Sequence, residues 1–212
     1  MIRPGFTVWL TGLPVSGKTT LGRMLTRALR ALGMGAVHLE GSDIRRALGP
    51  ELDFSPEDRR QANQRAAWVA SRIAQAGGAA VVSAIAPSAA ARREARAMLG
   101  EYVEVFLDCP LEQLINRDER QLYARALESG AGEFTGLGAP YEPPADPEVR
   151  CLTGRETPEE SLAKVLAYLS EAGLIAQPDE GTSPAGGSDG EAVYSDEEEA
   201  EIVARLKDLG YL

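Results

Sequence analysis

The hydrophobic pattern of the chain alternates between short apolar runs and stretches of helical spacing. Apolar runs typical of buried strands occupy five segments, at residues 6–11, 35–39, 79–85, 102–107 and 149–152. Between the first two runs, apolar side chains recur every three or four residues from Leu21 to Leu32, which predicts a helix. Strands that alternate with helices predict a three-layer α/β fold, with a parallel sheet of about five strands and helices on both faces.

Two further helices have clear starting signals. Ser55, followed by proline and two acidic residues, predicts an N-cap for a helix over residues 56–76. The sequence Thr157-Pro-Glu-Glu160 predicts a capping box at the start of a later helix. The apolar face of that helix would carry Leu162, Val165, Leu166 and Leu169.

The remaining segments predict a lid, a linker and a tail. Residues 128–149 are rich in glycine and proline and lack periodicity, and a loop this long inside a domain is usually functional, so we expect a lid. We expect one domain over residues 1–172, a flexible linker over 173–192 and an acidic amphipathic helix over 193–212. A lone helix of this length is marginal in water. It should therefore dock on its own domain or on a partner chain, such as a second copy in a homodimer.

The connection between the first strand and the first helix carries the most specific motif. It reads Gly12, Leu13, Pro14, Val15, Ser16, Gly17, Lys18, Thr19 and Thr20, the pattern of a phosphate-binding P-loop. Its glycines let backbone N–H groups surround phosphate oxygens at the positive end of the helix dipole. Lys18 can reach the β and γ phosphates, and the Thr19 hydroxyl can ligate magnesium. The motif predicts ATP and Mg²⁺ as cofactors.

Composition and charge limit the kinds of binding partner that the sequence predicts. The formal net charge is −10, but residues 173–212 hold ten acidic and two basic residues, so the domain itself is near neutral and shows no nucleic-acid footprint. No apolar run approaches the roughly 18 residues of a membrane span, and we expect no membrane partner. The first strand follows Met1 too closely for a signal peptide, and Cys109 and Cys151 are expected to be reduced core residues. These features predict a cytoplasmic protein, and the single histidine, His38, is expected to pack at a strand end.

Further motifs follow the P-loop in a fixed order. They are Leu-Glu-Gly-Ser-Asp-Ile-Arg at 39–45, Leu-Asp-Phe-Ser-Pro-Glu-Asp-Arg at 52–59, Ile-Ala-Pro at 85–87, Leu-Asp-Cys-Pro-Leu-Glu at 107–112, Arg-Asp at 117–118, Phe-Thr-Gly at 134–136 and Pro-Tyr-Glu at 140–142. Together they resemble the adenylylsulfate (APS) kinase family over about residues 4–170. That resemblance implies transfer of the γ-phosphoryl group of ATP to the 3′-hydroxyl of adenosine 5′-phosphosulfate, a small-molecule nucleotide substrate.

The resemblance also implies site residues. The acceptor nucleotide would meet Arg45, Phe54, Arg59, Ile85, Phe134, Thr135 and Gly136. An arginine fork suits a phosphosulfate because it pairs two oxygens at once, and the two phenylalanines could sandwich a base. Arg117 could balance charge on the ATP phosphates. Each arginine, taken singly, could instead form a surface salt bridge.

The carboxylates depart from the family pattern. Of the two aspartates that follow the second strand in the family, the first is Glu40 here and the second is Ser42, with Asp43 one position later. We expect Lys18, Glu40 and Asp43 to be catalytic, with Thr19 and Glu40 facing the metal. Asp43 could alternatively be only an N-terminal helix charge.

Expectations also concern three other positions: two depart from the family pattern, and one is assigned to a helix start. Ala62 stands where the family has an asparagine, and Ala86 stands where it has a phosphorylatable serine. We expect Asp108 to start a helical segment rather than to bind metal. The resemblance thus implies an APS kinase. Two alternatives stay open: a related phosphotransferase for another nucleotide conjugate or small hydroxyl acceptor, and a nucleotide-binding module with little turnover.

Overall fold

The computed structural model describes residues 5–176, which form a parallel α/β domain. Its strands are β1 Phe6–Thr11, β2 Ala36–Glu40, β3 Ala79–Ser83, β4 Glu101–Leu107 and β5 Val149–Cys151. Its helices are α1 Lys18–Ala31, α2 Gly41–Leu48, α3 Pro56–Gln75, α4 Ala89–Met98, α5 Leu111–Asn116, α6 Leu122–Glu128 and α7 Pro158–Glu171. The predicted acidic helix and most of the predicted linker lie outside the described residues.

The described strands form one sheet in the order β2-β3-β1-β4-β5, and all neighbouring pairs are parallel. The five predicted strand segments are confirmed to within about two residues at each end. All six residues of β1 are buried. A central parallel strand is covered on both faces, which explains why it reads as a continuous apolar run rather than as an alternating one.

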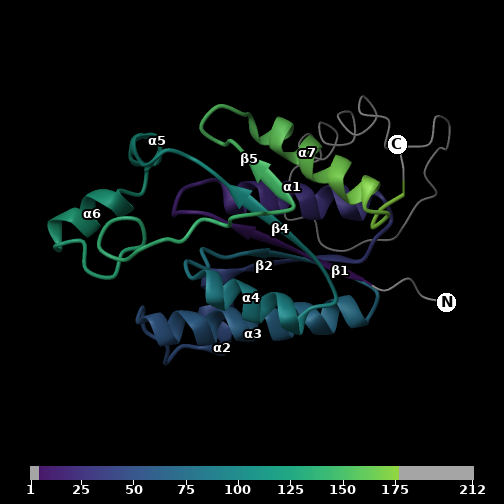
Figure 1. Ribbon diagram of the computed structural model, residues 1–212, viewed down its shortest axis with the longest axis horizontal. Helices are drawn as coiled ribbons and strands as arrows, with labels where there is room; N and C mark the ends of the chain where they lie inside the picture. Colours follow the sequence, from purple (N-terminus) through teal and green to yellow (C-terminus); the bar gives the residue numbers. More distant parts are fainter. Residues whose placement is uncertain (1–4, 177–212) are drawn as a thin grey trace.

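Figure 1 shows α1 and α7 on one face of the sheet and α2, α3 and α4 on the other. Each face has its own hydrophobic core. Phe6, Val8 and Leu10 pack toward α1 and α7, whereas Trp9 packs toward α3 and α4. Successive side chains of a strand point to opposite faces, so one strand supplies both cores. The three-layer architecture is therefore confirmed.

The helix-start signals are confirmed in detail. The Ser55 hydroxyl accepts a hydrogen bond from the Asp58 N–H, with Pro56 as the first helical residue of α3. At α7, Thr157 and Glu160 form the reciprocal capping box. In contrast, α1 begins at Lys18 after Gly17 as its N-cap, with no side-chain cap and no acidic residue in its first turn. Its N-terminal N–H groups are therefore left available for an external anion.

One local expectation was wrong. Asp108 does not start a helix, because α5 begins at Leu111 after Pro110. The Asp108 carboxylate instead accepts hydrogen bonds from the Arg150 guanidinium and so joins the end of β4 to β5.

Within residues 5–176, every helix is too short or too polar to cross a lipid bilayer.

Candidate active site

The P-loop joins the end of β1 to the start of α1 in a tightly wound turn. Gly12 and Gly17 have φ values of 152° and 97°, and a Cβ at Gly12 would lie 2.6 Å from the Leu107 carbonyl. Val15 has a φ of 64°, which is rare for a β-branched residue. Its side chain packs in an apolar cluster around Tyr123, whose hydroxyl donates to the Pro14 carbonyl at 3.0 Å. The loop is thus held from outside by α6.

The Lys18 ammonium lies inside this turn. It donates to the carbonyls of Gly12 at 3.0 Å and Leu13 at 2.6 Å, and to the Ser16 hydroxyl at 3.3 Å. Burial lowers the pKa of Lys18 to about 8, and the nearby negative charge of Glu40 opposes part of that shift. Lys18 is thus a buried cation held by the neutral oxygens of its own loop.

Glu40 ends β2 beside the P-loop. One carboxylate oxygen, Oε2, is buried without a hydrogen-bond partner and lies 3.9 Å from His38 Nε2. Within residues 5–176, no group of three or more histidine, cysteine, aspartate or glutamate side chains could hold a metal ion. A bound Mg²⁺ would therefore rely on nucleotide phosphates together with one or two protein oxygens. The unpartnered Glu40 oxygen fits that requirement.

A polar chain links this carboxylate strand to the P-loop helix. The Ser83 hydroxyl donates to the Lys18 backbone carbonyl at 3.0 Å, so His38 Nε2–H must be the donor in its 2.8 Å contact with Ser83. Burial lowers the pKa of His38 to about 4, which keeps its ring neutral. The expectation that His38 packs at a strand end was wrong, since it lies in the middle of β2 and makes a polar contact.

The other predicted carboxylate points elsewhere. Asp43 lies in the first turn of α2, largely exposed, and pairs with Arg46 on the same helix at 3.2 Å. Ser42 is also exposed. This contact matches the alternative in which Asp43 is a helix-terminal charge rather than a partner of Glu40.

Arg45 and Arg59 converge on one loop from two helices. Arg45 donates to the carbonyls of Leu52 and Asp53 at 3.3 and 2.6 Å, and Arg59 donates to the carbonyl of Phe54 at 2.7 Å. Both guanidinium groups lie over the Phe54 ring, at 4.9 and 5.4 Å from its centroid. Burial and the neighbouring Arg45 charge lower the pKa of Arg59. Two cations placed this close favour an anion between them.

Arg59 also reaches the lid, which comprises residues 129–148. It donates to the Thr135 hydroxyl at 2.9 Å and to the Glu133 carbonyl at 2.5 Å. Phe134 packs edge-on against Tyr123 with ring centroids 5.0 Å apart, and a Cβ at Gly136 would meet the Leu13 side chain at 2.7 Å. The lid therefore touches both α3 and the P-loop. Phe54, which is 53% exposed, offers the more accessible aromatic face.

Two remaining predicted residues lie on the flanks of the site. The Ile85 carbonyl accepts a hydrogen bond at 2.7 Å from the hydroxyl of Thr11, the residue directly before the P-loop. Arg117, at the end of α5, is exposed and donates to the Thr153 carbonyl at 2.7 Å. The structure thus brings Arg45, Arg59, Phe54 and the lid together, whereas Arg117 makes a separate contact.

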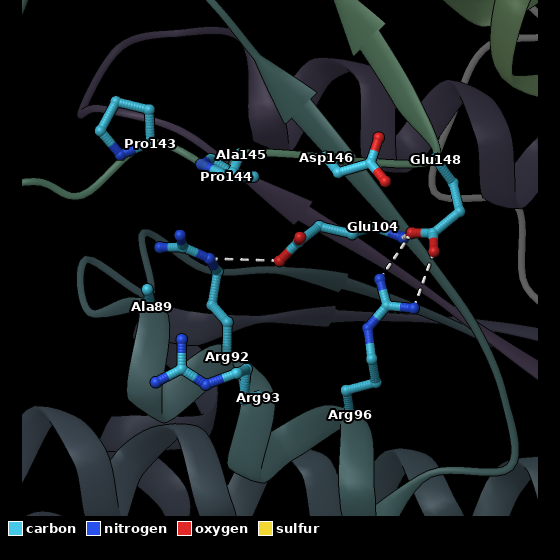
Figure 2. Close-up of a pocket in the computed structure, with 10 residues that line it drawn as sticks. All are labelled: Ala89, Arg92, Arg93, Arg96, Glu104, Pro143, Pro144, Ala145, Asp146 and Glu148. Atoms are coloured by element: carbon cyan, nitrogen blue, oxygen red, sulfur yellow. Dashed lines mark hydrogen bonds and ion pairs between the residues drawn. The ribbon is translucent and has the colours of Figure 1, made fainter.

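Sequence reasoning missed several polar residues around the site. Tyr123 holds the P-loop, Ser83 links β3 to the P-loop helix, and Arg92 holds the lid. Each of these contacts joins residues that are far apart in the sequence, so no local pattern predicts them. A cavity of about 370 Å³ lies between α4, β4 and the lid, lined by Arg92, Arg93, Arg96 and Glu104 on one side and residues 143–146 on the other (Figure 2). None of the predicted site residues lines it.

Comparisons with known proteins agree with this geometry. The family model of adenylylsulphate kinase matches residues 4–152. The chain is 40% identical over 176 residues to the adenylyl-sulfate kinase of Halothermothrix orenii, covering 83% of this chain and 95% of that protein. It is 46% identical over 171 residues to a probable bifunctional SAT/APS kinase of Sorangium cellulosum, covering 81% of this chain but 29% of that longer protein.

A solved structure gives the same picture of the fold. The Mycobacterium tuberculosis APS kinase, in complex with AMPPNP and APS, superposes with a TM-score of 0.75 at 34% identity. The match covers 79% of this chain and 98% of that chain.

The pKa of Lys18 leads to a test by calorimetry. Because burial lowers the pKa of Lys18 to about 8, binding of MgADP near that pH should favour the charged form of the side chain. We therefore expect proton uptake on binding near pH 8, measured in two buffers of different ionisation enthalpy, and weaker binding as the pH rises further. In Lys18→Arg the side chain stays charged, so this uptake should vanish. Equal uptake in both proteins would contradict the assignment.

Proposed function

The chain belongs to the adenylylsulphate kinase family, and we propose that it transfers the γ-phosphoryl group of ATP to the 3′-hydroxyl of APS. It is an ATP-dependent kinase, and the product of this transfer is 3′-phosphoadenosine 5′-phosphosulfate. The observation that carries the proposal is the uncapped P-loop helix with the buried Lys18 ammonium, placed beside an arginine pair that faces a lid.

On the ATP side, the loop from Gly12 to Thr20 would hold the phosphates. The bonds of the Lys18 ammonium to loop carbonyls keep the turn closed, and phosphate oxygens would replace some of those carbonyls when ATP binds. Thr19 and Glu40 would face Mg²⁺, which neutralises charge on the phosphates when it is bound. Arg117 would add positive charge from the end of α5.

On the acceptor side, Arg45 and Arg59 would pair the phosphosulfate, and Phe54 and Phe134 would flank the adenine. Arginine suits this role because its planar fork binds two oxygens of an anion at once. Thr135 and Gly136 belong to the lid, which would cover the nucleotide, and Ile85 would line the opposite wall. The contacts of Arg59 to Glu133 and Thr135 support this placement, because they already join α3 to the lid.

Glu40 is the carboxylate placed to act near the reacting groups. Its buried, unpartnered oxygen lies at the carboxyl end of β2, next to Lys18. Ligands of open α/β sheets bind at the carboxyl ends of the strands. Glu40 would therefore face Mg²⁺ or orient the 3′-hydroxyl, while Asp43 would act as a charge at the start of α2.

Two features bear on the compartment and the oligomeric state that we propose for the enzyme: its free thiols and its acidic C-terminal segment. Cys109 and Cys151 are buried and unpaired in the described domain, as expected. A reducing compartment such as the cytoplasm fits two free thiols. Dimerisation through the acidic segment at 193–212 stays a prediction from sequence.

A direct assay tests the function. Purified full-length protein with MgATP should phosphorylate APS, with the product separated chromatographically, and Lys18→Ala should abolish turnover because it removes the cation that contacts the phosphates. Circular dichroism would check that the variant is folded. Turnover with another hydroxyl acceptor and none with APS would favour the related phosphotransferase, for which Ser42 and Ala62, both departures from the family pattern, give the sequence argument.

The arginine pair gives a second test. Arg59→Lys should raise the KM for APS by roughly 10- to 150-fold, since loss of a charged hydrogen bond costs roughly 1.5–3 kcal/mol. A point charge cannot reproduce the fork. Arg60→Lys is the matched control, because Arg60 lies beside it on α3 and pairs with Glu57 and Glu94. An effect of Arg59→Lys on the KM for ATP alone would count against the assignment.

The two carboxylates can be separated by isosteric amides. Glu40→Gln should lower kcat by 100-fold or more, on the order of what a general acid–base group contributes, with little change in melting temperature. Asp43→Asn should leave kcat within about twofold and cost at most about 1 kcal/mol of stability, as expected for a helix-terminal charge. If Asp43→Asn lowers kcat as severely as Glu40→Gln, and the double variant lowers it little more, the two carboxylates act as one unit.

A further inference from the structure

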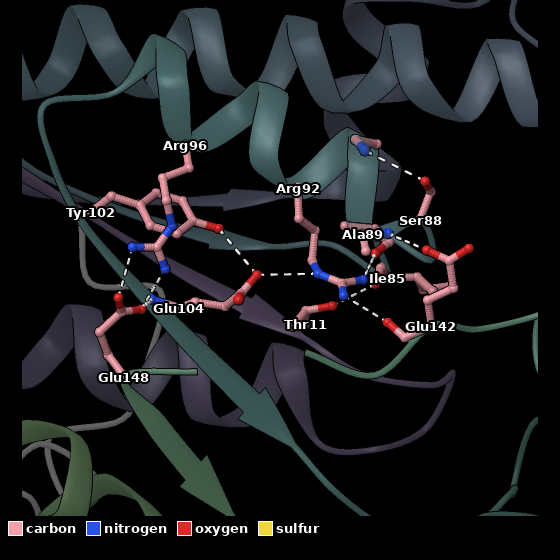
Figure 3. Close-up of polar contacts among 12 residues, drawn as sticks. Thr11, Ile85, Ser88, Ala89, Arg92, Arg96, Tyr102, Glu104, Glu142 and Glu148 are labelled. Atoms are coloured by element: carbon pink, nitrogen blue, oxygen red, sulfur yellow. Dashed lines mark hydrogen bonds and ion pairs between the residues drawn. The ribbon is translucent and has the colours of Figure 1, made fainter. Parts of the chain in front are cut away.

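A buried arginine on α4 joins three parts of the chain behind the acceptor side of the site. Arg92 is 4% exposed, and its guanidinium Nε lies 3.2 Å from the Glu104 carboxylate of β4. Its other two nitrogens donate to backbone carbonyls, to Ala86 at 2.7 Å and to Glu142 at 2.6 Å (Figure 3). Each nitrogen therefore binds an oxygen on a different segment.

The two carbonyls belong to the segments that flank the site. Ala86 lies in the loop after β3, next to Ile85. Glu142 is the second residue of the return arm of the lid, residues 141–148, which leads back to β5. The Thr11 hydroxyl donates to the Ile85 carbonyl at 2.7 Å, and the Tyr141 hydroxyl must then donate to Thr11 at 3.0 Å. Thr11 thus binds the same two segments from the P-loop side that Arg92 binds from the α4 side.

These contacts form a closed ring. It runs from Thr11 to the 85–86 loop, to Arg92, to the return arm at 141–142, and back to Thr11. Glu142 strengthens it, since its carboxylate accepts from the Ala89 N–H and its own N–H donates to the Pro87 carbonyl. Ala86 has a φ of 42°, a conformation that costs free energy for a residue with a side chain. The bond from Arg92 holds this carbonyl in place.

We propose that Arg92 is a positioning residue for the acceptor: it fixes the return arm of the lid against the loop at 85–87, so that the pocket for APS is assembled before APS binds. This inference rests on the proposed acceptor site. Arg92 acts through the two backbone segments and does not touch the nucleotide. A pocket that is already assembled does not spend binding free energy on ordering the lid.

The chemistry of the site requires arginine at this position. A buried cation must be paired and hydrogen-bonded, and the guanidinium satisfies Glu104 and two carbonyls in one plane. A lysine could keep the ion pair with Glu104, but its single nitrogen cannot reach two carbonyls and a carboxylate in the same fork geometry. Arg92→Lys therefore separates positioning from charge pairing.

The same helix carries a matched control. Arg96, one turn later on α4, binds both oxygens of Glu148 at 2.7 Å, and Glu148 also accepts from the Glu104 N–H at 2.7 Å. This pair anchors the far end of the return arm, and the 370 Å³ cavity separates α4 from the middle of the arm (Figure 2). None of the contacts of Arg96 involves the loop at 85–87 or the residues 141–142.

The experiment compares Arg92→Lys with Arg96→Lys in the full-length protein. Arg92→Lys should raise the KM for APS about tenfold, the loss expected for one or two neutral-acceptor hydrogen bonds, and leave the MgADP dissociation constant within twofold. Arg96→Lys should leave both constants within twofold, even if it lowers the melting temperature as much as Arg92→Lys does. An unchanged KM for APS in Arg92→Lys, or equal increases in both variants, would overturn the proposal.

A third variant guards against a simple stability effect. Glu104→Gln removes the ion pair but leaves the bonds from Arg92 to Ala86 and Glu142, so it should lower the melting temperature while the KM for APS stays near the wild-type value. A rise in the KM for APS that follows the melting temperature across all three variants would contradict positioning. A wild-type protein that neither binds nor phosphorylates APS would overturn the proposed function itself, independently of these variants.

Discussion

The buried ammonium of Lys18 is the interaction around which the site is organised. It closes the P-loop by binding the carbonyls of Gly12 and Leu13, while the backbone carbonyl of the same residue accepts from Ser83 on β3. Ser83 in turn binds His38 on β2, the strand that ends at Glu40. Through Ser83, Lys18 is therefore linked to both β3 and β2, the two strands on one side of β1 in the sheet order. Burial lowers the pKa of Lys18 to about 8. Because the oxygens that hold its ammonium are neutral, an arriving phosphate is a better partner than those it has.

The acceptor side depends on a different kind of constraint. The lid has almost no regular structure, so its position relies on contacts at a few points. Arg59 binds it from α3, Leu13 and Tyr123 pack against it from the P-loop and α6, and Arg92 holds its return arm. Arg59 and Arg92 each bind a backbone carbonyl of the lid, Glu133 and Glu142 respectively, and such contacts fix the path of the backbone itself. The two halves of the site meet at Thr11, the last residue before the P-loop.

Sequence patterns predicted the strands that are buried on both faces and the helix caps that depend only on neighbouring residues. Buried parallel strands are apolar throughout, and the caps of α3 and α7 depend only on local residues, so both could be predicted. Helix α4 was missed because its buried side consists of Ala91, Ala95 and Arg92 rather than large apolar residues. A sequence gives no reason to expect arginine in a core, since its burial requires Glu104 and two carbonyls from distant segments. The P-loop could be predicted because its spacing is itself the motif, whereas Arg45 and Arg59 were expected as site residues from the family resemblance.

The exchange of aspartate for Glu40 can be understood from the backbone around it. Glu40 pairs with Ser83 across β2 and β3, and Gly41 follows at once, where a Cβ would lie only 3.0 Å from the Ser83 carbonyl. The backbone is thus pressed against β3 and fixes the direction in which the side chain leaves the strand. Glutamate is one methylene longer than aspartate, and the Oε2 atom of Glu40 is buried without a hydrogen-bond partner. Such an oxygen is costly unless a cation binds it. Under the proposed function, the Mg²⁺ that accompanies ATP would offset this cost, and Glu40 would act from the same side of the site as an aspartate but with a longer reach.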